Sequence, residues 1–199
     1  ALPILRKADG SLQKPVAYLT CNFNRPVSGK PALFTHDEVI TLFHEFCHTL
    51  HGLFASQRYA TLSGTNTPRD FVEFPSQINE HWASHPQVFA HFARHYQTGE
   101  PMPDALREKM LTATQFNKGY DMTELLSAAL LDMNWHGIQE PVEDVEAFEA
   151  AALKKEGLDL PAVPPRYRSS YFAHIFGGGY AAGYYAYLWT QMLADDGYQ

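Results

Sequence analysis

Apolar side chains recur at a helical spacing along most of this chain, and the clearest run follows residue 35. Its apolar positions are Val39, Leu42, Phe43, Phe46, Leu50 and Leu53. Gaps of three and four residues place such side chains on one face of an α-helix. Thr35 and Glu38 fit a capping box, in which a hydroxyl and a carboxylate satisfy free backbone N–H groups. We therefore predict an amphipathic helix that begins after Thr35 and ends near Ser56.

The rest of the chain predicts further helices joined by turn-rich segments. A second helix, capped by Asp70, is expected to run to about Ser84, with a kink or restart at Pro75, because proline cannot continue a helical hydrogen-bond ladder. Shorter helical patterns cover residues 86–97, 104–117, 121–136, 143–156 and 180–194. One short strand is expected at residues 16–23, where β-branched and aromatic residues cluster. The predicted fold class is mainly α, with a minor β element near the N-terminus.

Composition narrows the classes of protein to which the chain can belong. Its 199 residues are 45% hydrophobic and 19% charged, which suits a globular core. A net charge of −7 argues against nucleic acid as a partner, since phosphate contacts need a basic excess. No apolar run approaches the ~20 residues of a membrane helix, so no membrane partner is expected. Two cysteines are too few for a disulfide framework, and they favour a cytoplasmic location.

The best-defined helix also carries a metal-binding pattern, because residues 44–48 read His-Glu-Phe-Cys-His and fit H-E-x-x-H. Histidines four residues apart lie within about 40° of each other around a helix axis, so both imidazoles face one point. Two nitrogens in that arrangement suit one Zn²⁺ ion. Glu45 lies about 100° from His44, so we expect it to act as a general base toward a water molecule, with only His44 and His48 binding the ion from this helix.

A third protein ligand is expected from a neighbouring element, because catalytic zinc usually has three. Glu73 is the best candidate, since a carboxylate between two apolar neighbours is expected to face inward, where its charge needs a partner. The alternative is that Glu73 pairs with Asp70 in a helix cap. Gln77 lies one turn further on and is predicted to orient a ligand from behind.

Other histidines match the zinc pattern less well. His81 and His85, like His91 and His95, are four apart, but neither pair has Glu after its first histidine. We expect packing or solvated roles for both pairs. His51 lies on the same stripe as the zinc histidines, yet it is nearly two turns from His44, so we expect it to pack beside the site.

Tyrosines gather near the end of the chain. Tyr180, Tyr184 and Tyr187 fall at i, i+4 and i+7 of the predicted last helix and would form one stripe of phenols. Phenol O–H groups could stabilise the negative charge that develops on a carbonyl oxygen during peptide hydrolysis. The alternative is that these rings are core aromatics. Gly178 and Gly179, within a run of three glycines, suit a flexible loop against which a peptide backbone can lie.

Three stretches, residues 42–52, 69–82 and 171–189, resemble the thimet oligopeptidase family of zinc peptidases, family M3. The intervening sequence is also similar. Within the family, Phe74 before Pro-Ser-Gln and the triple glycine favour the peptidyl-dipeptidase branch. Cys47 departs from the pattern, since the family usually has glycine there; its thiol is expected to pack as a small hydrophobic group or to be open to oxidation.

The resemblance implies a set of roles and a larger protein. It implies one zinc ion per chain, held by His44, His48 and Glu73, with Glu45 as the base. It assigns substrate binding and transition-state stabilisation to His174, Tyr184 and Tyr187, and less firmly to Tyr180. The family fold is a helical zincin with a deep channel for short unstructured peptides. Because its members are several hundred residues longer, we expect residues 1–199 to be a C-terminal catalytic core without its N-terminal part.

The predicted function is that of a zinc peptidyl-dipeptidase, which removes C-terminal dipeptides from oligopeptides. Two alternatives stay open at this stage. One is an endo-acting oligopeptidase of the same family, and the other is an inactive helical fragment that binds zinc or peptide.

Overall fold

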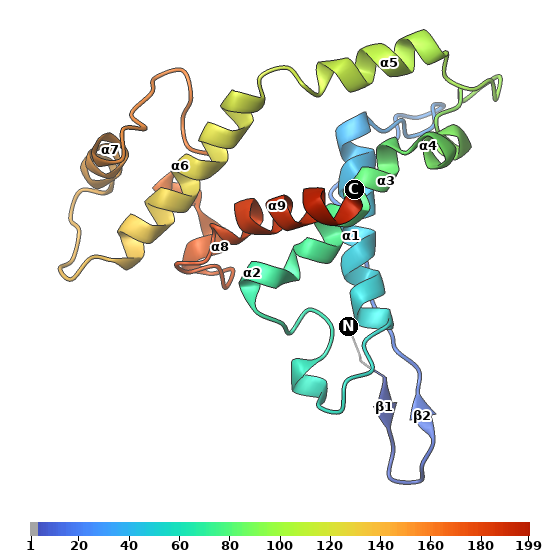
Figure 1. Ribbon diagram of the computed structural model, residues 1–199, viewed down its shortest axis with the longest axis horizontal. Coiled ribbons are helices and arrows are strands. Elements are labelled where there is room, and N and C mark those ends of the chain that lie inside the picture. The colour runs from blue at the N-terminus through green and yellow to red at the C-terminus, as the bar shows by residue number, and fades with distance from the viewer. Residues whose placement is uncertain (1–3) are drawn as a thin grey trace. The chain divides into compact units, whose positions relative to one another are not determined.

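The computed structural model describes residues 4–199 and is built mainly from helices (Figure 1). The α-helices are α1 (His36–Leu53), α2 (Arg69–Val72), α3 (Phe74–Ser84), α4 (Pro86–Phe92), α5 (Asp104–Ala113), α6 (Lys118–His136), α7 (Val145–Lys155), α8 (Ala173–Phe176) and α9 (Ala186–Tyr198). Two 3₁₀ turns, η1 (Ala60–Leu62) and η2 (Ser169–Tyr171), accompany them. The predicted mainly α class is confirmed. The chain divides into two compact units: a first unit of residues 1–111 with 190–199, and a second unit of residues 112–189.

The β element is a hairpin close to the N-terminus, earlier than predicted. Strands β1 (Leu5–Arg6) and β2 (Leu12–Gln13) pair antiparallel. Their turn contains Asp9 and Gly10, and the positive φ of Gly10, 80°, is one that glycine adopts without strain. The predicted strand at residues 16–23 is wrong, because only Val16 takes part in a β-bridge there. A strand-forming composition gives a strand only where pairing with a neighbouring segment extends over several consecutive residues.

Helix α1 begins where the sequence predicts. The Thr35 hydroxyl accepts from the Glu38 N–H at 3.2 Å, and the Glu38 carboxylate accepts from the Thr35 N–H at 2.8 Å, so the capping box is complete. The helix ends at Leu53, and Phe54 follows as its C-cap residue.

The predicted second helix is interrupted near Pro75 and becomes α2 and α3. Pro68 is the N-cap residue of α2, so the prediction that Asp70 caps this helix is wrong. Glu73 lies at the junction, where it is both the C-cap residue of α2 and the N-cap residue of α3. Pro75 then stands in the first turn of α3, where its missing N–H leaves no hydrogen bond unmade.

Polar contacts hold α1 against α3 in the first unit, where the two helices lie side by side (Figure 1). The Asn79 amide donates to the Phe43 carbonyl at 2.7 Å. The Cys47 thiol donates to the Pro75 carbonyl at 3.0 Å, and burial raises the pKa of this thiol. Cys47 therefore packs between the helices as a protonated thiol, which agrees with the packing role predicted for it.

The second unit has an aromatic and aliphatic core between α6 and the segment after η2. Its buried members are Ala128, Ala129, Phe172, Ile175, Tyr180 and Tyr184. Small residues on α6, Ala128 and Ala129, leave room for the rings of Phe172, Tyr180 and Tyr184.

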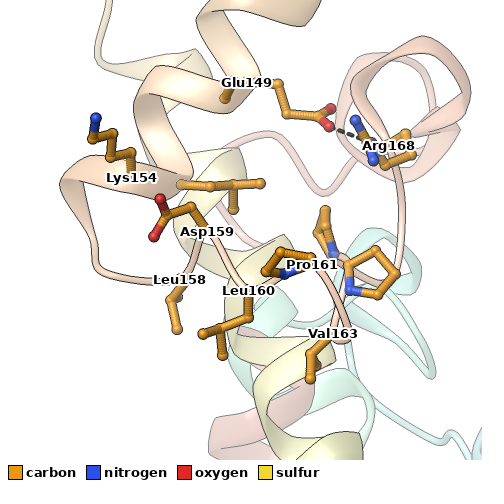
Figure 2. A pocket seen from close by; sticks show the side chains of 12 residues that line it. Glu149, Lys154, Leu158, Asp159, Leu160, Pro161, Val163 and Arg168 are labelled. Atoms are coloured by element: carbon orange, nitrogen blue, oxygen red, sulfur yellow. Dashed lines mark ion pairs between the residues drawn. The ribbon is translucent and has the colours of Figure 1, made fainter.

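A buried carboxylate on α7 anchors η2 in the same unit. Glu149 accepts from the backbone N–H and the hydroxyl of Ser169, at 2.7 and 2.8 Å, and forms an ion pair with Arg168. The Trp135 indole N–H in turn donates to the Ser169 hydroxyl at 2.8 Å. Figure 2 shows the ion pair beside a pocket of about 320 Å³, lined by α7 and the proline-rich residues 158–165.

The last helix begins later than predicted. Residues 181–185 form turns, and α9 runs from Ala186 to Tyr198 where the sequence predicts 180–194. Ala182 has φ of 50°, which interrupts any helix at that residue. No helix in the described part of the chain combines the length and apolar character that crossing a membrane requires.

Removal of the capping hydroxyl of α1 is expected to destabilise the chain. Thr35→Ala leaves the Glu38 N–H without its side-chain acceptor, and we expect the free energy of unfolding to fall by about 1 kcal/mol. Urea denaturation measures this difference.

Thr41→Ala is the matched control on the same helix. The Thr41 hydroxyl donates to the Asp37 carbonyl inside α1, a contact that adds little to helix stability, so we expect a change within about 0.5 kcal/mol. Equal stabilities of the two variants would contradict the role of the cap.

Candidate metal centre

Three side-chain donors of the first unit converge on one point. His44 and His48 are one turn apart on α1, and their Nε2 atoms lie 3.2 Å from each other. The Glu73 Oε2 atom lies 3.2 Å from His44 Nε2 and 3.1 Å from His48 Nε2. The structure therefore brings together the three residues that the sequence predicts as ligands, and their donor atoms form a nearly equilateral triangle.

The size of this triangle fits a small divalent metal ion. Ligands about 2.0–2.1 Å from a tetrahedral ion lie about 3.3 Å from one another, close to the three observed separations. Without a metal ion, a proton on His44 relieves the repulsion between the lone pairs of these donors, and a divalent cation would take the place of that proton. Two nitrogens and one oxygen are also a donor set that zinc accepts.

The backbone explains how Glu73 reaches the histidines. The residue lies at the junction of α2 and α3 and is only 4% exposed, so its carboxylate needs a partner inside the fold. The imidazoles of α1 provide it. Because Pro68 is the N-cap residue of α2 and no side-chain cap hydrogen bond forms there, the alternative in which Glu73 and Asp70 form a capping box is wrong.

Glu80 completes the surroundings of His44, and the sequence analysis did not identify it. Its Oε1 atom lies 2.6 Å from His44 Nδ1, so Nδ1 donates to this carboxylate, and in the neutral imidazole the Nε2 lone pair would face the triangle. Glu80 is seven residues after Glu73, two helical turns on the same face. That spacing in the sequence could have indicated that Glu80 faces the same site as Glu73. It does so only once α3 is known to pack on α1.

The charges around His44 favour a cation at this point. Burial disfavours the charged imidazolium, but the carboxylates of Glu73 and Glu80 outweigh it and raise the pKa of His44 to about 9. Without metal, this residue therefore holds a proton at neutral pH. The same two carboxylates would stabilise a divalent ion that displaces that proton.

Glu45 lies beside the triangle without belonging to it. It is half-buried on α1, next to His44, and it is not among the three converging ligands. Burial and then the negative charge of Glu45 raise the pKa of the Cys21 thiol, so the loop around residue 21 lies near this carboxylate. The proton-transfer role of Glu45 stays a prediction.

Gln77 and His51 occupy the edges of the site. The Gln77 amide oxygen accepts from the Thr190 hydroxyl at 2.5 Å, a contact between α3 and α9, and its support of a metal ligand stays a prediction. Burial and then the nearby His48 lower the pKa of His51. A neutral, half-buried imidazole suits the packing role expected of it.

His81 also has neighbours that suit packing. Its ring stacks on Tyr198, with 4.5 Å between ring centroids, and its Nε2 atom lies 3.1 Å from a carboxylate oxygen of Asp195. His85 lies against Trp82, with 5.2 Å between ring centroids.

The second unit gathers the predicted substrate residues in an aromatic cluster. This cluster consists of Tyr167, His174, Tyr180, Tyr184 and Tyr187. The His174 ring is central, with centroid distances of 4.7 to 6.5 Å to the four tyrosine rings. The sequence analysis did not single out Tyr167, although it belongs to the same tyrosine-rich stretch.

The tyrosines meet by a different route from the one predicted. Tyr180 and Tyr184 precede α9, so the expected helical stripe is wrong, but Tyr187 still stacks on Tyr180 and lies against Tyr184, at 5.2 and 5.0 Å between centroids. Tyr180 and Tyr184 are also buried in the core, as the alternative held. Burial raises the pKa of Tyr184, so its phenol stays protonated and can donate.

The glycine run turns closely back on α8. A Cβ at Gly178 would lie 2.9 Å from the His174 Cα atom, so only glycine fits there, and Gly179 has φ of 82°. The Tyr180 N–H donates to the His174 carbonyl at 2.9 Å. The glycines therefore bring Tyr180 back beside His174, while contact of Gly178 and Gly179 with a peptide stays a prediction.

The sequence matches known proteins along almost its whole length. Residues 3–199 match peptidase family M3. Dipeptidyl carboxypeptidase of Escherichia coli (strain K12) is 74% identical over 187 residues, which are 93% of this chain and 28% of that protein. Oligopeptidase A of the same strain is 50% identical over 196 residues, or 98% of this chain and 29% of that protein.

A more distant relative has the same coverage. Saccharolysin of Saccharomyces cerevisiae (strain ATCC 204508 / S288c) is 31% identical over 193 residues, 96% of this chain and 27% of that protein. The chain thus spans less than a third of the length of each of these relatives. Because the family match covers almost every residue and includes the converging histidines and glutamate, the chain belongs to peptidase family M3.

Proposed function

We propose that the chain is the catalytic core of a zinc metallopeptidase that hydrolyses short unstructured peptides. The observation that carries this proposal is the triangle of His44, His48 and Glu73 donor atoms, with Glu45 next to it on α1. When bound there, one zinc ion would polarise the scissile carbonyl and make a water molecule more acidic. Glu80 would hold His44 in the tautomer that binds the ion.

Glu45 performs the proton transfers in this proposal. Its carboxylate accepts a proton from the water that attacks the scissile carbonyl carbon, and the C–O bond forms. The same proton then passes to the leaving amine nitrogen as the C–N bond breaks, so the carboxylate is regenerated. A carboxylate half-buried next to a metal ligand is well suited to both steps.

The aromatic cluster is proposed to bind substrate and stabilise the transition state. His174, Tyr184 and Tyr187 would supply N–H and O–H donors to the oxyanion, and Tyr180 would contribute less directly. The raised pKa of Tyr184 supports this role, since a donor must keep its proton at the working pH. Gly178 and Gly179 would lie against the peptide backbone.

We further propose peptidyl-dipeptidase action, in which dipeptides leave from the C-terminus. The 74% identity to a protein named dipeptidyl carboxypeptidase supports this direction of attack. Endo-acting cleavage is the second candidate, supported by the 50% identity to oligopeptidase A. A fragment that binds zinc or peptide without hydrolysis is the third.

The setting of the activity is part of the proposal. Two free cysteines suit the reducing cytoplasm, and the acidic net charge suits neither nucleic acid nor an anionic membrane surface as a partner. The greater length of the relatives supports a longer protein, in which an N-terminal part would complete the substrate channel.

Peptides with free and amidated C-termini test the direction of attack. We expect stepwise loss of C-terminal dipeptides from the free form only, because exo-cleavage depends on recognition of the terminal carboxylate; mass spectrometry of the products measures it. Internal cleavage of both forms would support the oligopeptidase. A zinc-loaded chain that leaves both forms intact would support the third candidate, a fragment that binds without hydrolysis.

Glu45→Gln is expected to separate metal binding from turnover. The amide cannot accept the proton, so we expect kcat to fall by about 10²–10⁴-fold while the zinc content stays at one per chain. Peptide hydrolysis and atomic absorption measure the two quantities. Near-normal turnover in this variant would exclude Glu45 as the base.

Substitutions of Glu73 and Glu80 are expected to lower zinc affinity to different extents. Glu73→Ala removes a ligand, and we expect zinc to be lost on dialysis. Glu80→Gln keeps an acceptor for His44 Nδ1 but removes the charge, and we expect about 10–100-fold weaker binding. Competition with a chelating dye measures both affinities.

Glu108→Gln serves as the control for these two variants. Glu108 is an exposed carboxylate on α5 in the same unit, and we expect its loss to leave the zinc affinity unchanged. Wild-type affinity in Glu73→Ala would rule out Glu73 as the third ligand.

A further inference from the structure

The turn that carries the tyrosines has a backbone shape that its own residues do not favour. Residues 181–185 form turns, and the φ of 50° at Ala182 is one that a residue with a Cβ atom rarely adopts. The methyl side chain of Ala182 offers no hydrogen bond that would compensate. An interaction from outside the turn must therefore stabilise it.

Asp132 of α6 supplies that interaction. Its side chain is 0% exposed, and both of its oxygens accept backbone hydrogen bonds from the turn. The Ala182 N–H donates to Oδ1 at 2.9 Å, and the Tyr184 N–H donates to Oδ2 at 2.9 Å. Hydrogen bonds to an ionised carboxylate are stronger than those between neutral groups, so this pair can hold the turn against its strain.

His136 provides the remaining contact of this carboxylate. One turn further along α6, its Nδ1 atom lies 2.8 Å from Asp132 Oδ1 and 2.9 Å from the Asp132 carbonyl oxygen. The imidazole therefore helps to satisfy a negative charge that would be costly to bury alone.

The position of the turn decides the position of the rings. Because the Tyr184 N–H is bound to Asp132, the Tyr184 ring is directed into the aromatic cluster, 5.6 Å from His174 and 5.0 Å from Tyr187 between centroids. Tyr187 lies in the first turn of α9, which begins at Ala186 directly after this turn, so Tyr187 takes its position from the same backbone. Asp132 itself contacts neither ring in the pairs described, so it acts through the main chain.

We propose that Asp132 is a positioning residue, which sets the phenols of Tyr184 and Tyr187 through the backbone N–H groups of Ala182 and Tyr184. The proposal rests on the proposed peptidase function for its consequence on turnover. The stabilisation of residues 181–185 by the Asp132 carboxylate does not depend on that function.

Asp132→Asn in the zinc-loaded chain tests directly whether the two hydrogen bonds stabilise the turn. The amide is nearly the same size but has one acceptor oxygen, so one of the two N–H groups loses its partner. We expect amide hydrogen exchange in residues 180–187 to become at least tenfold faster, with no change in α7 and no change in zinc content. Unchanged exchange in residues 180–187 would overturn the proposal.

A double-mutant cycle tests the path through Tyr184. We expect Asp132→Asn to lower kcat by about 10–100-fold, because small displacements of catalytic groups cost that much, with kcat/KM falling equally. In a Tyr184→Phe background, the same change should have little further effect. The proposal would be overturned if the kcat losses of the two single variants multiplied in the double variant, or if Tyr184→Phe left kcat unchanged.

Asp144→Asn is the matched control in the same unit. The Asp144 carboxylate accepts one backbone N–H, from Ala147 at 2.9 Å, at the start of α7, and we expect its change to alter neither exchange in residues 180–187 nor turnover. If Asp132→Asn does not fold, exchange in the wild-type chain still decides: rapid exchange of the Ala182 and Tyr184 amides would refute the hold. A wild-type chain without peptidase activity would contradict the proposed function, and the exchange comparison would still test Asp132.

Discussion

The packing of α1 against α3 is the contact on which the first unit depends. Helix α1 alone directs two imidazoles to one point, but the third donor and the carboxylate behind His44 come from the chain that enters and forms α3. The contacts of Asn79 with Phe43 and of Cys47 with Pro75 hold the two helices together beside these donors. Metal ligation and helix packing are therefore one arrangement, and a metal ion would stabilise the same contact that creates its site.

The second unit relies on buried carboxylates in a comparable way. Asp132 and Glu149 are each buried, and each accepts hydrogen bonds from irregular backbone that no helix or strand could satisfy. A buried charge is costly unless several donors surround it, and here the backbone N–H groups, His136 and Arg168 provide them. The irregular segments between η2 and α9 thereby keep a defined shape, and they carry Tyr180 and Tyr184 of the aromatic cluster.

The two units divide the proposed chemistry between them. The first holds the residues that would bind the ion and move the proton, and the second holds the donors proposed for the substrate. Membership of peptidase family M3 gives both sets one context, since the family match includes residues of both units. Tyr180 and Tyr184 illustrate that a core role and a functional role are compatible, because a ring fixed by packing presents its hydroxyl in a constant position.

The sequence alone determined those features that arise from contacts between residues of the same helix. The capping box of α1, the shared face of His44 and His48, and the restart near Pro75 follow from helix geometry and local hydrogen bonds, so they were predictable. Tertiary structure decided the rest. Residues 16–23 found no strand partner, Glu80 gained its role only through α3 packing on α1, and Asp132 diverted residues 181–185 from the predicted helix. Each of these depends on a group far away in the sequence, whose position no local pattern of residues encodes.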